Sequence, residues 1–69
     1  MEPSNYKLKI GELIGQTRAW RQMTQAELAK KIGTSQSAVN RIENGNQNLS
    51  IEMIEKISEA LHVELLAFL

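Results

Sequence analysis

The chain has 69 residues, one histidine and no cysteine, and its eight basic and eight acidic side chains cancel to a formal net charge of zero. This length allows one small domain, and the composition excludes a disulfide framework, a cysteine-based zinc site and a metal site built on the lone histidine. We find no signal peptide and no apolar run long enough to cross a membrane, and we expect a cytoplasmic protein without cofactor, metal or evident small-molecule ligand.

The charges are unevenly ordered along the chain. Residues 1–41 carry seven basic and three acidic side chains, a balance of +4, whereas residues 42–69 carry one basic and five acidic side chains, a balance of −4. A binding partner responds to the charge of the face that it contacts rather than to the net charge of the whole protein. We therefore expect a neutral protein with one basic face.

Apolar spacing predicts an all-α chain that begins with a frayed tail over residues 1–6. The first helix is expected over about Lys7–Arg21, with its apolar stripe on Ile10, Leu13 and Ile14. Gly11 and Gly15 weaken this helix slightly but allow another element to pack closely against it. Trp20 lies about 80° from the centre of the stripe on a helical wheel, so we expect it to be half-buried.

Two short helices with clear start and stop signals follow. The segment "TQAE", Thr24–Glu27, is a capping box that predicts a helix over Gln25–Ile32, and Gly33 is suited to end it. Ser35 is a natural N-cap for the next helix, which carries Val39 and Ile42 inward and stops at Asn44-Gly45.

Two further helices complete the expected set of five. Ser50 caps a fourth helix whose apolar stripe is Ile51, Ile54, Ile57 and Leu61, and His62 stands at its end. The segment "VELLAFL" is expected to form a short last helix over Glu64–Leu69 or a buried apolar tail. We therefore expect residues 7–69 to form a single domain.

The second and third of these helices have the features of a helix-turn-helix. Two helices that cross closely need a small residue, which Ala29 supplies, and a permissive turn, which Gly33 supplies. Four inward apolar anchors fall at the required spacing: Leu28, Ile32, Val39 and Ile42. The face opposite Val39 and Ile42 is polar and consists of Gln36, Ser37, Asn40 and Arg41.

The segment "MTQAELAKKIGTSQSAVNRIENG", Met23–Gly45, resembles the helix-turn-helix core of the phage repressor and Cro family, also called Xre-type domains. The segment "LSIEMIEKISEALHVELLAF" resembles the fourth and fifth helices of that family, so the likeness covers about Ile10–Phe68. It implies a compact five-helix, lambda-repressor-like domain that binds double-stranded DNA, commonly as a homodimer on a palindromic operator. Gln22 and His62 depart from the family pattern, because glycine is common at both positions.

The side chains of the polar face suit base recognition in the major groove. A recognition helix enters with its N-terminal residues foremost, glutamine can bridge adenine, and arginine can fork onto guanine or grip phosphate. We expect Gln36, Ser37 and Arg41 to contact bases, together with Asn40, and the resemblance supports Gln36 and Ser37 in this role. The alternative is that these residues form an ordinary solvated helix face.

Other polar residues are candidates for phosphate contacts. Gln25 begins a helix, where free amides and partial positive charge favour a phosphate, and Thr34 and Ser35 lie in the turn. The resemblance implies that the exit Asn44–Asn46 meets phosphate through main-chain amides. It also implies an ion pair between Arg18 and Glu43, from which Arg18 could reach a phosphate as well.

Three other functions are compared with sequence-specific regulation. A protein-interaction module or antitoxin-type domain with the same fold would suit the neutral charge and the apolar segment "LLAFL". A DNA-targeting domain fused to a further domain beyond Leu69 also remains open. We do not expect an enzyme, because the sequence contains no nucleophile-base pair, phosphate loop or metal-ligand spacing.

Overall fold

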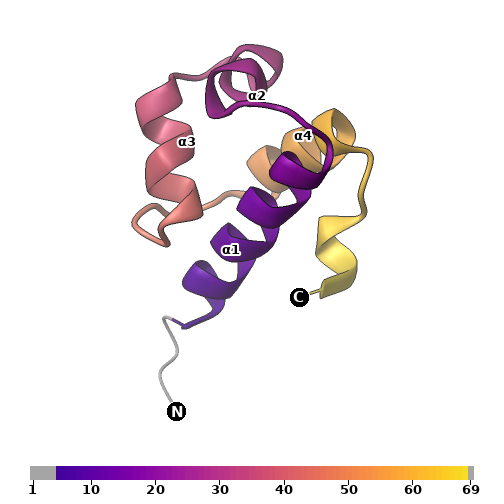
Figure 1. Ribbon diagram of the computed structural model, residues 1–69. Coiled ribbons are helices and arrows are strands. Elements are labelled where there is room, and N and C mark those ends of the chain that lie inside the picture. The colour runs from indigo at the N-terminus through magenta and orange to yellow at the C-terminus, as the bar shows by residue number, and fades with distance from the viewer. Residues whose placement is uncertain (1–4, 69) are drawn as a thin grey trace.

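The computed structural model describes residues 5–68 as a bundle of short helices (Figure 1). The elements in chain order are α1 (Asn5–Trp20), α2 (Gln25–Ile32), α3 (Gln36–Glu43), α4 (Ile51–Leu61) and the 3₁₀ turn η1 (Leu65–Phe68). The all-α prediction is confirmed, although the expected fifth helix is a single 3₁₀ turn within these residues. None of the described helices is both long enough and apolar enough to cross a bilayer.

Three of the helices begin at a side-chain cap, as their sequences predict. The Thr24 hydroxyl accepts a hydrogen bond from the Glu27 amide at 3.0 Å, and the Glu27 carboxylate accepts one from the Thr24 amide at 2.7 Å. Ser35 and Ser50 cap α3 and α4 in the same way through their hydroxyl oxygens. Such caps satisfy amides that a helix start otherwise leaves without partners.

All four α-helices end with a residue in the left-handed conformation. These residues are Gln22, Gly33, Gly45 and His62, with φ between 56° and 76°. After each one, the next amide donates back to a carbonyl five residues earlier, for example from Asn46 to Arg41 at 2.9 Å. The positions where the sequence departs from the family's glycine therefore adopt the glycine-like geometry, at a cost of ~1–2 kcal/mol each.

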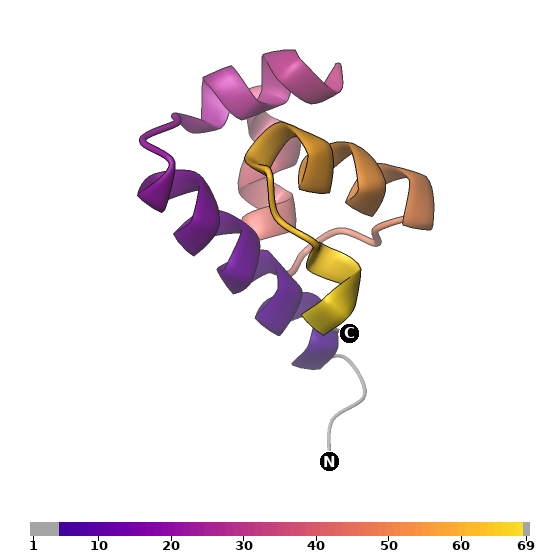
Figure 2. The ribbon, with the colours of Figure 1, turned by 90° about the vertical axis from the view of Figure 1, so that its right-hand side faces the viewer.

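The apolar core lies where the helices meet. Its most deeply buried side chains come from every element: Ile14 from α1, Leu28 from α2, Val39 and Ile42 from α3, Ile57 and Leu61 from α4, and Leu65 from η1. Figure 2 shows η1 folding back under α4 toward the first half of α1. Gly11 is buried against the end of α3, where a Cβ atom would overlap the Ile42 carbonyl oxygen. The expected close packing therefore occurs, and it brings α3 against α1.

Two expectations for α1 need correction. Helix α1 starts at Asn5 rather than Lys7, so Tyr6 is helical, and the rest of the expected tail lies outside the described residues. Trp20 is 76% exposed rather than half-buried, because α1 ends there and the chain turns away toward α2. The Arg21 guanidinium lies over its ring, 4.9 Å from the ring centroid.

Candidate nucleic-acid interface

Helices α2 and α3 pack against each other through the small set of apolar residues that the motif requires. Leu28, Ala29 and Ile32 of α2 and Val39 and Ile42 of α3 are all buried. Gly33 ends α2 at φ 76°, and Ser35 starts α3 two residues later. This close spacing holds the two helices in the helix-turn-helix arrangement expected from the sequence.

The outer face of α3 brings four of the sequence-predicted residues together. Gln36, Ser37, Asn40 and Arg41 are all exposed, whereas Ala38, Val39 and Ile42 are buried. In Figure 1, α3 stands at one edge of the molecule with no other element outside it. The geometry therefore leaves this polar face open to a large partner.

Two of these side chains are held by residues that follow α3. The Asn44 side-chain amide donates to the backbone carbonyl of Asn40 at 2.9 Å and to its side-chain oxygen at 3.2 Å. Arg41 Nε donates to Gln47 Oε1 at 3.1 Å. Sequence reasoning missed Gln47. The available signal was the turn at Gly45, which returns the chain toward the last turn of α3.

The expected pair of Arg18 and Glu43 is present and ties α1 to the end of α3. Arg18 Nε lies 2.6 Å from Glu43 Oε2, and its Nη2 donates to Oε1 at 3.1 Å. The third nitrogen, Nη1, donates to the Met23 carbonyl at 2.7 Å. The hydrogen bond to Glu43 raises the pKa of Arg18 above its ordinary value.

This network changes the role expected for Arg18. All three guanidinium nitrogens point at protein acceptors, and the side chain is only 19% exposed. Arg18 therefore holds the fold together in this geometry, and its expected phosphate contact is not supported.

Gln25 belongs to the same network. Its Nε2 donates to Glu43 Oε1 at 3.0 Å, so the side chain is held at the start of α2 beside α1 and α3. At this helix start, the Thr24 and Glu27 amides are used by the capping box. The amides of Gln25 and Ala26 are the two that a capping box leaves for another acceptor, and a phosphate is one such acceptor.

The exit from α3 differs from the expectation in one respect. The amides of Asn44, Gly45 and Asn46 donate to the carbonyls of Asn40, Ile42 and Arg41, at 2.9–3.1 Å. Because these amides already have protein acceptors, the main-chain phosphate contact expected from the resemblance is not supported. The exposed side chains of Asn44 and Asn46 remain on this surface.

Two residues of the turn have mixed roles. The Ser35 hydroxyl accepts from the Ala38 amide at 3.1 Å, which caps α3 and leaves the hydroxyl hydrogen as a donor. Thr34 is half-buried, and its amide donates to the Ala29 carbonyl at 2.9 Å.

A shallow polar hollow lies between α1 and the helix-turn-helix. Gln25, Asn40 and Asn44 line it from α2 and α3, and α1 contributes Glu12 and Gln16. Sequence reasoning did not single out Glu12 or Gln16, because only the tertiary packing brings α1 beside α3. Arg18 and Glu43 also line the hollow but pair with each other, so the Glu12 carboxylate adds a charge of the same sign as a phosphate.

The expected basic face does not coincide with the outer face of α3. Arg18 is paired, and Arg21 donates to the carbonyls of Leu61 and His62 at the end of α4, at 2.8 and 2.9 Å. Lys30 and Lys31 line a different hollow with Lys56. Lys30 and Lys31 also line an adjoining hollow with Arg21, so these bases lie together beside α2 and α4, and Arg41 is the basic residue within α3 itself.

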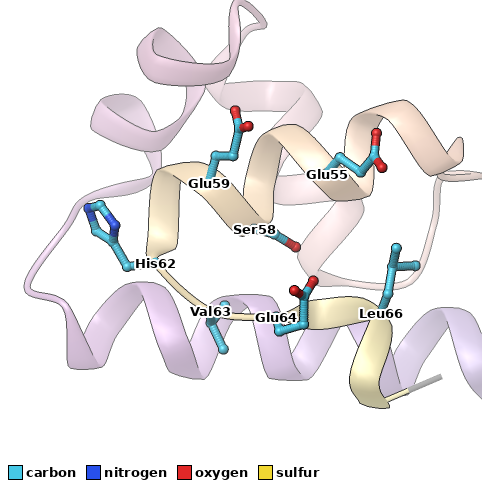
Figure 3. Close-up of a pocket in the computed structure, with 7 residues that line it drawn as sticks. All are labelled: Glu55, Ser58, Glu59, His62, Val63, Glu64 and Leu66. Carbon is cyan, nitrogen blue, oxygen red and sulfur yellow. The ribbon is translucent and has the colours of Figure 1, made fainter.

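Three of the eight acidic residues lie together away from the outer face of α3. Glu55, Glu59 and Glu64 line a hollow between α4 and η1, together with His62 (Figure 3). Figure 1 shows η1 and α3 on opposite sides of α1. The acidic second half of the sequence thus forms an acidic cluster at α4 and η1, while Glu12 and Glu43 lie on the side where α1 meets α3.

The comparisons with known proteins agree with this architecture. Residues 14–68 match the helix-turn-helix family. The chain is 36% identical over 62 residues to the control protein C.BamHI of Bacillus amyloliquefaciens, which covers 88% of the chain and 76% of that protein. It is 35% identical over 54 residues to the antitoxin HipB of Escherichia coli K12, covering 78% of the chain and 58% of that protein.

The fold also superimposes on a solved structure. The restriction-modification controller protein C.AhdI from Aeromonas hydrophila has a TM-score of 0.89 at 26% identity, with both chains covered completely. The chain spans 38% and 44% of the length of two longer relatives, both HTH-type transcriptional regulators of Sinorhizobium fredii. The resemblance inferred from the motif is confirmed, and the chain belongs to the Xre-type helix-turn-helix family of DNA-binding transcription regulators.

Proposed function

We propose that this chain binds a specific double-stranded DNA sequence with α3 in the major groove and thereby regulates transcription. The observation that carries the proposal is the division of α3 into two faces. Ala38, Val39 and Ile42 fix the helix to the core, and the opposite face presents only polar side chains to solvent. The proposed activity is binding rather than catalysis.

The four exposed residues of α3 have chemistry suited to base edges. Gln36 and Ser37 occupy the first turn of α3, the end of a recognition helix that enters the groove first. Glutamine can bridge adenine N6 and N7, and the Arg41 guanidinium can fork onto guanine O6 and N7. A good bidentate contact contributes about 1–3 kcal/mol of discrimination against the wrong base.

Phosphate contacts would supply most of the affinity and set the register. We assign them to Gln25 at the start of α2, to Thr34 and Ser35 in the turn, and to the Asn46 side chain. The Asn44 side-chain amide would have to leave Asn40 in order to donate to a phosphate. Hydrogen bonds from neutral side chains and amides position a protein on DNA without requiring a strongly basic surface. This assignment is compatible with zero net charge.

We further propose that two copies bind a palindromic operator in the cytoplasm. A single α3 of eight residues can contact only one short half-site. Two-fold pairing doubles the contacts, and it places the two recognition helices one helical turn of DNA, about 34–36 Å, apart.

Selection from a random duplex library tests the proposal. The wild-type chain should enrich one palindrome-like sequence, and its affinity should fall as salt rises, with a slope set by the number of cationic side chains that reach phosphates. Gln36→Ala and Arg41→Ala should each lose preference at one base position, whereas Lys56→Ala on α4 serves as a matched loss of positive charge away from α3. A flat salt response with no enriched sequence would refute the proposal.

A second candidate is an antitoxin-type role, in which the same domain also binds a protein. It is favoured by the similarity to the antitoxin HipB and by the acidic surface of α4 and η1. Charge reversal at Glu55 and Glu59 should then abolish binding of the protein partner but leave DNA affinity intact. Loss of DNA affinity in that variant would count against a separate protein-binding surface.

A further inference from the structure

We infer that Gln47 is a positioning residue that determines specificity by orienting Arg41 for base recognition. The inference rests on the proposed function, since it concerns how the α3 face contacts DNA. Gln47 lies outside α3 and outside the set of side chains expected to touch bases. Its role follows from one contact, the hydrogen bond from Arg41 Nε to Gln47 Oε1 at 3.1 Å.

The backbone turn after α3 brings Gln47 to this place. Gly45 adopts φ 75°, and the Asn46 amide donates to the Arg41 carbonyl at 2.9 Å, so the chain folds back beside the last turn of α3. Gln47 is half-buried, whereas Arg41 is exposed. The acceptor is therefore the better anchored of the two partners, and the arginine is the one that gains order.

The choice of atoms decides what Arg41 can present to DNA. A guanidinium has five N–H donors, and the hydrogen bond to Gln47 occupies the single donor on Nε. The two terminal nitrogens remain free to form an end-on fork, which matches the paired acceptors O6 and N7 of guanine. A long, flexible side chain also loses less conformational freedom on binding if it is already held in place.

The first test uses the free protein and does not depend on DNA. The rate at which the Arg41 Nε–H proton exchanges with water can be measured by nitrogen-15 NMR. This rate should increase about 2- to 10-fold in Gln47→Ala. The Nε–H of Arg18, which is bonded to Glu43, is the internal control and should not change. Identical exchange at Arg41 in both proteins would overturn the inference.

The second test measures DNA affinity on two duplexes. The first duplex carries the selected site. In the second duplex, one base pair is replaced, namely the pair for which Arg41→Ala has lost its preference. Gln47→Ala should weaken binding about 2- to 10-fold on the first duplex and leave the second nearly unchanged. In the Arg41→Ala background, Gln47→Ala should have no further effect, because its partner is already absent.

Other results would separate the possible failures. Equal losses on both duplexes, or additive losses in the double variant, would overturn the inference and indicate that Gln47 contacts the DNA backbone itself. Gln47→Glu keeps an acceptor for Nε and should keep the base preference, so its loss in that variant would also overturn the inference. If the wild-type chain selects no sequence at all, the proposed function fails first, and the NMR result still reports on the contact.

Discussion

Replacing Gly11 with alanine tests how closely α1 must approach α3. A Cβ atom at this position would overlap the carbonyl oxygen of Ile42 and lie 2.9 Å from that of Glu43. Both obstacles are backbone atoms of the recognition helix, so neither can rotate aside. At Gly15, one turn further along α1, the added atom would instead meet the flexible carboxylate of Glu43 at 3.1 Å.

The expected magnitudes differ in sign at the two glycines. Alanine is favoured over glycine within a helix by about 1 kcal/mol, and both variants gain this term. At Gly11, relieving the overlap requires the end of α3 to shift by on the order of 1 Å. Because the obstacles are backbone atoms, we take the upper part of the range for overpacking, about 2–3 kcal/mol, which leaves a net loss of about 1–2 kcal/mol after the helix gain. Gly11→Ala should therefore destabilise the domain, whereas Gly15→Ala should be neutral or slightly stabilising.

Thermal unfolding followed by circular dichroism measures the difference. A loss of 1 kcal/mol lowers the melting temperature of a domain of this size by about 4–8 °C. We expect Gly11→Ala to melt about 5–15 °C below the wild type and to bind DNA more weakly, since α3 is displaced. The comparison is made at one protein concentration, because pairing of two copies would raise the melting temperature. An unchanged melting temperature for Gly11→Ala, or equal losses in both variants, would refute the steric explanation.

Three further predictions concern exposed polar residues. Hydrogen bonds from Thr24 lower the pKa of Glu27 below its ordinary value of 4.5. The ionised Glu27 carboxylate therefore stabilises the fold above pH 4.5, and this contribution is lost as the pH falls through the lowered pKa. The difference in unfolding free energy between the wild type and Glu27→Gln, measured by urea unfolding, should close in acid. Ser35→Ala should cost about 1 kcal/mol of unfolding free energy through the lost cap. Glu12→Gln should tighten DNA binding about 2- to 5-fold at low salt on every sequence, whereas Glu55→Gln on α4 should not.

Local sequence signals predicted most of the fold because they act over a few residues. The capping box at Thr24, the serine caps and the apolar spacing of α2, α3 and α4 each require only neighbours along the chain. The prediction was wrong for Trp20, where packing rather than local preference decides, and for the start of α1, which lies two residues before the predicted one. Helical wheel position gives the direction of a side chain but not whether another element lies there.

The candidate site was predicted in part for the same reason. The exposed face of α3 follows from its period, so Gln36, Ser37, Asn40 and Arg41 could be named from the sequence. The protein acceptors that engage Arg18 and the amides of residues 44–46 could not be predicted from the sequence, because hydrogen-bond partners are determined only when the chain has folded. The same holds for Glu12, which reaches the α3 side through the packing of α1.

The sequence by itself determined the helices, their ends and the division of α3 into an apolar and a polar face. These properties depend on backbone preference and on the period of apolar residues, which are local quantities. Only the tertiary structure decided where the charges lie: Arg21 caps α4, Arg18 joins Glu43, and Lys30 and Lys31 of α2 meet Lys56 of α4 at one hollow. Electrostatic fields depend on distances between residues far apart in the chain, and those distances exist only in the folded molecule.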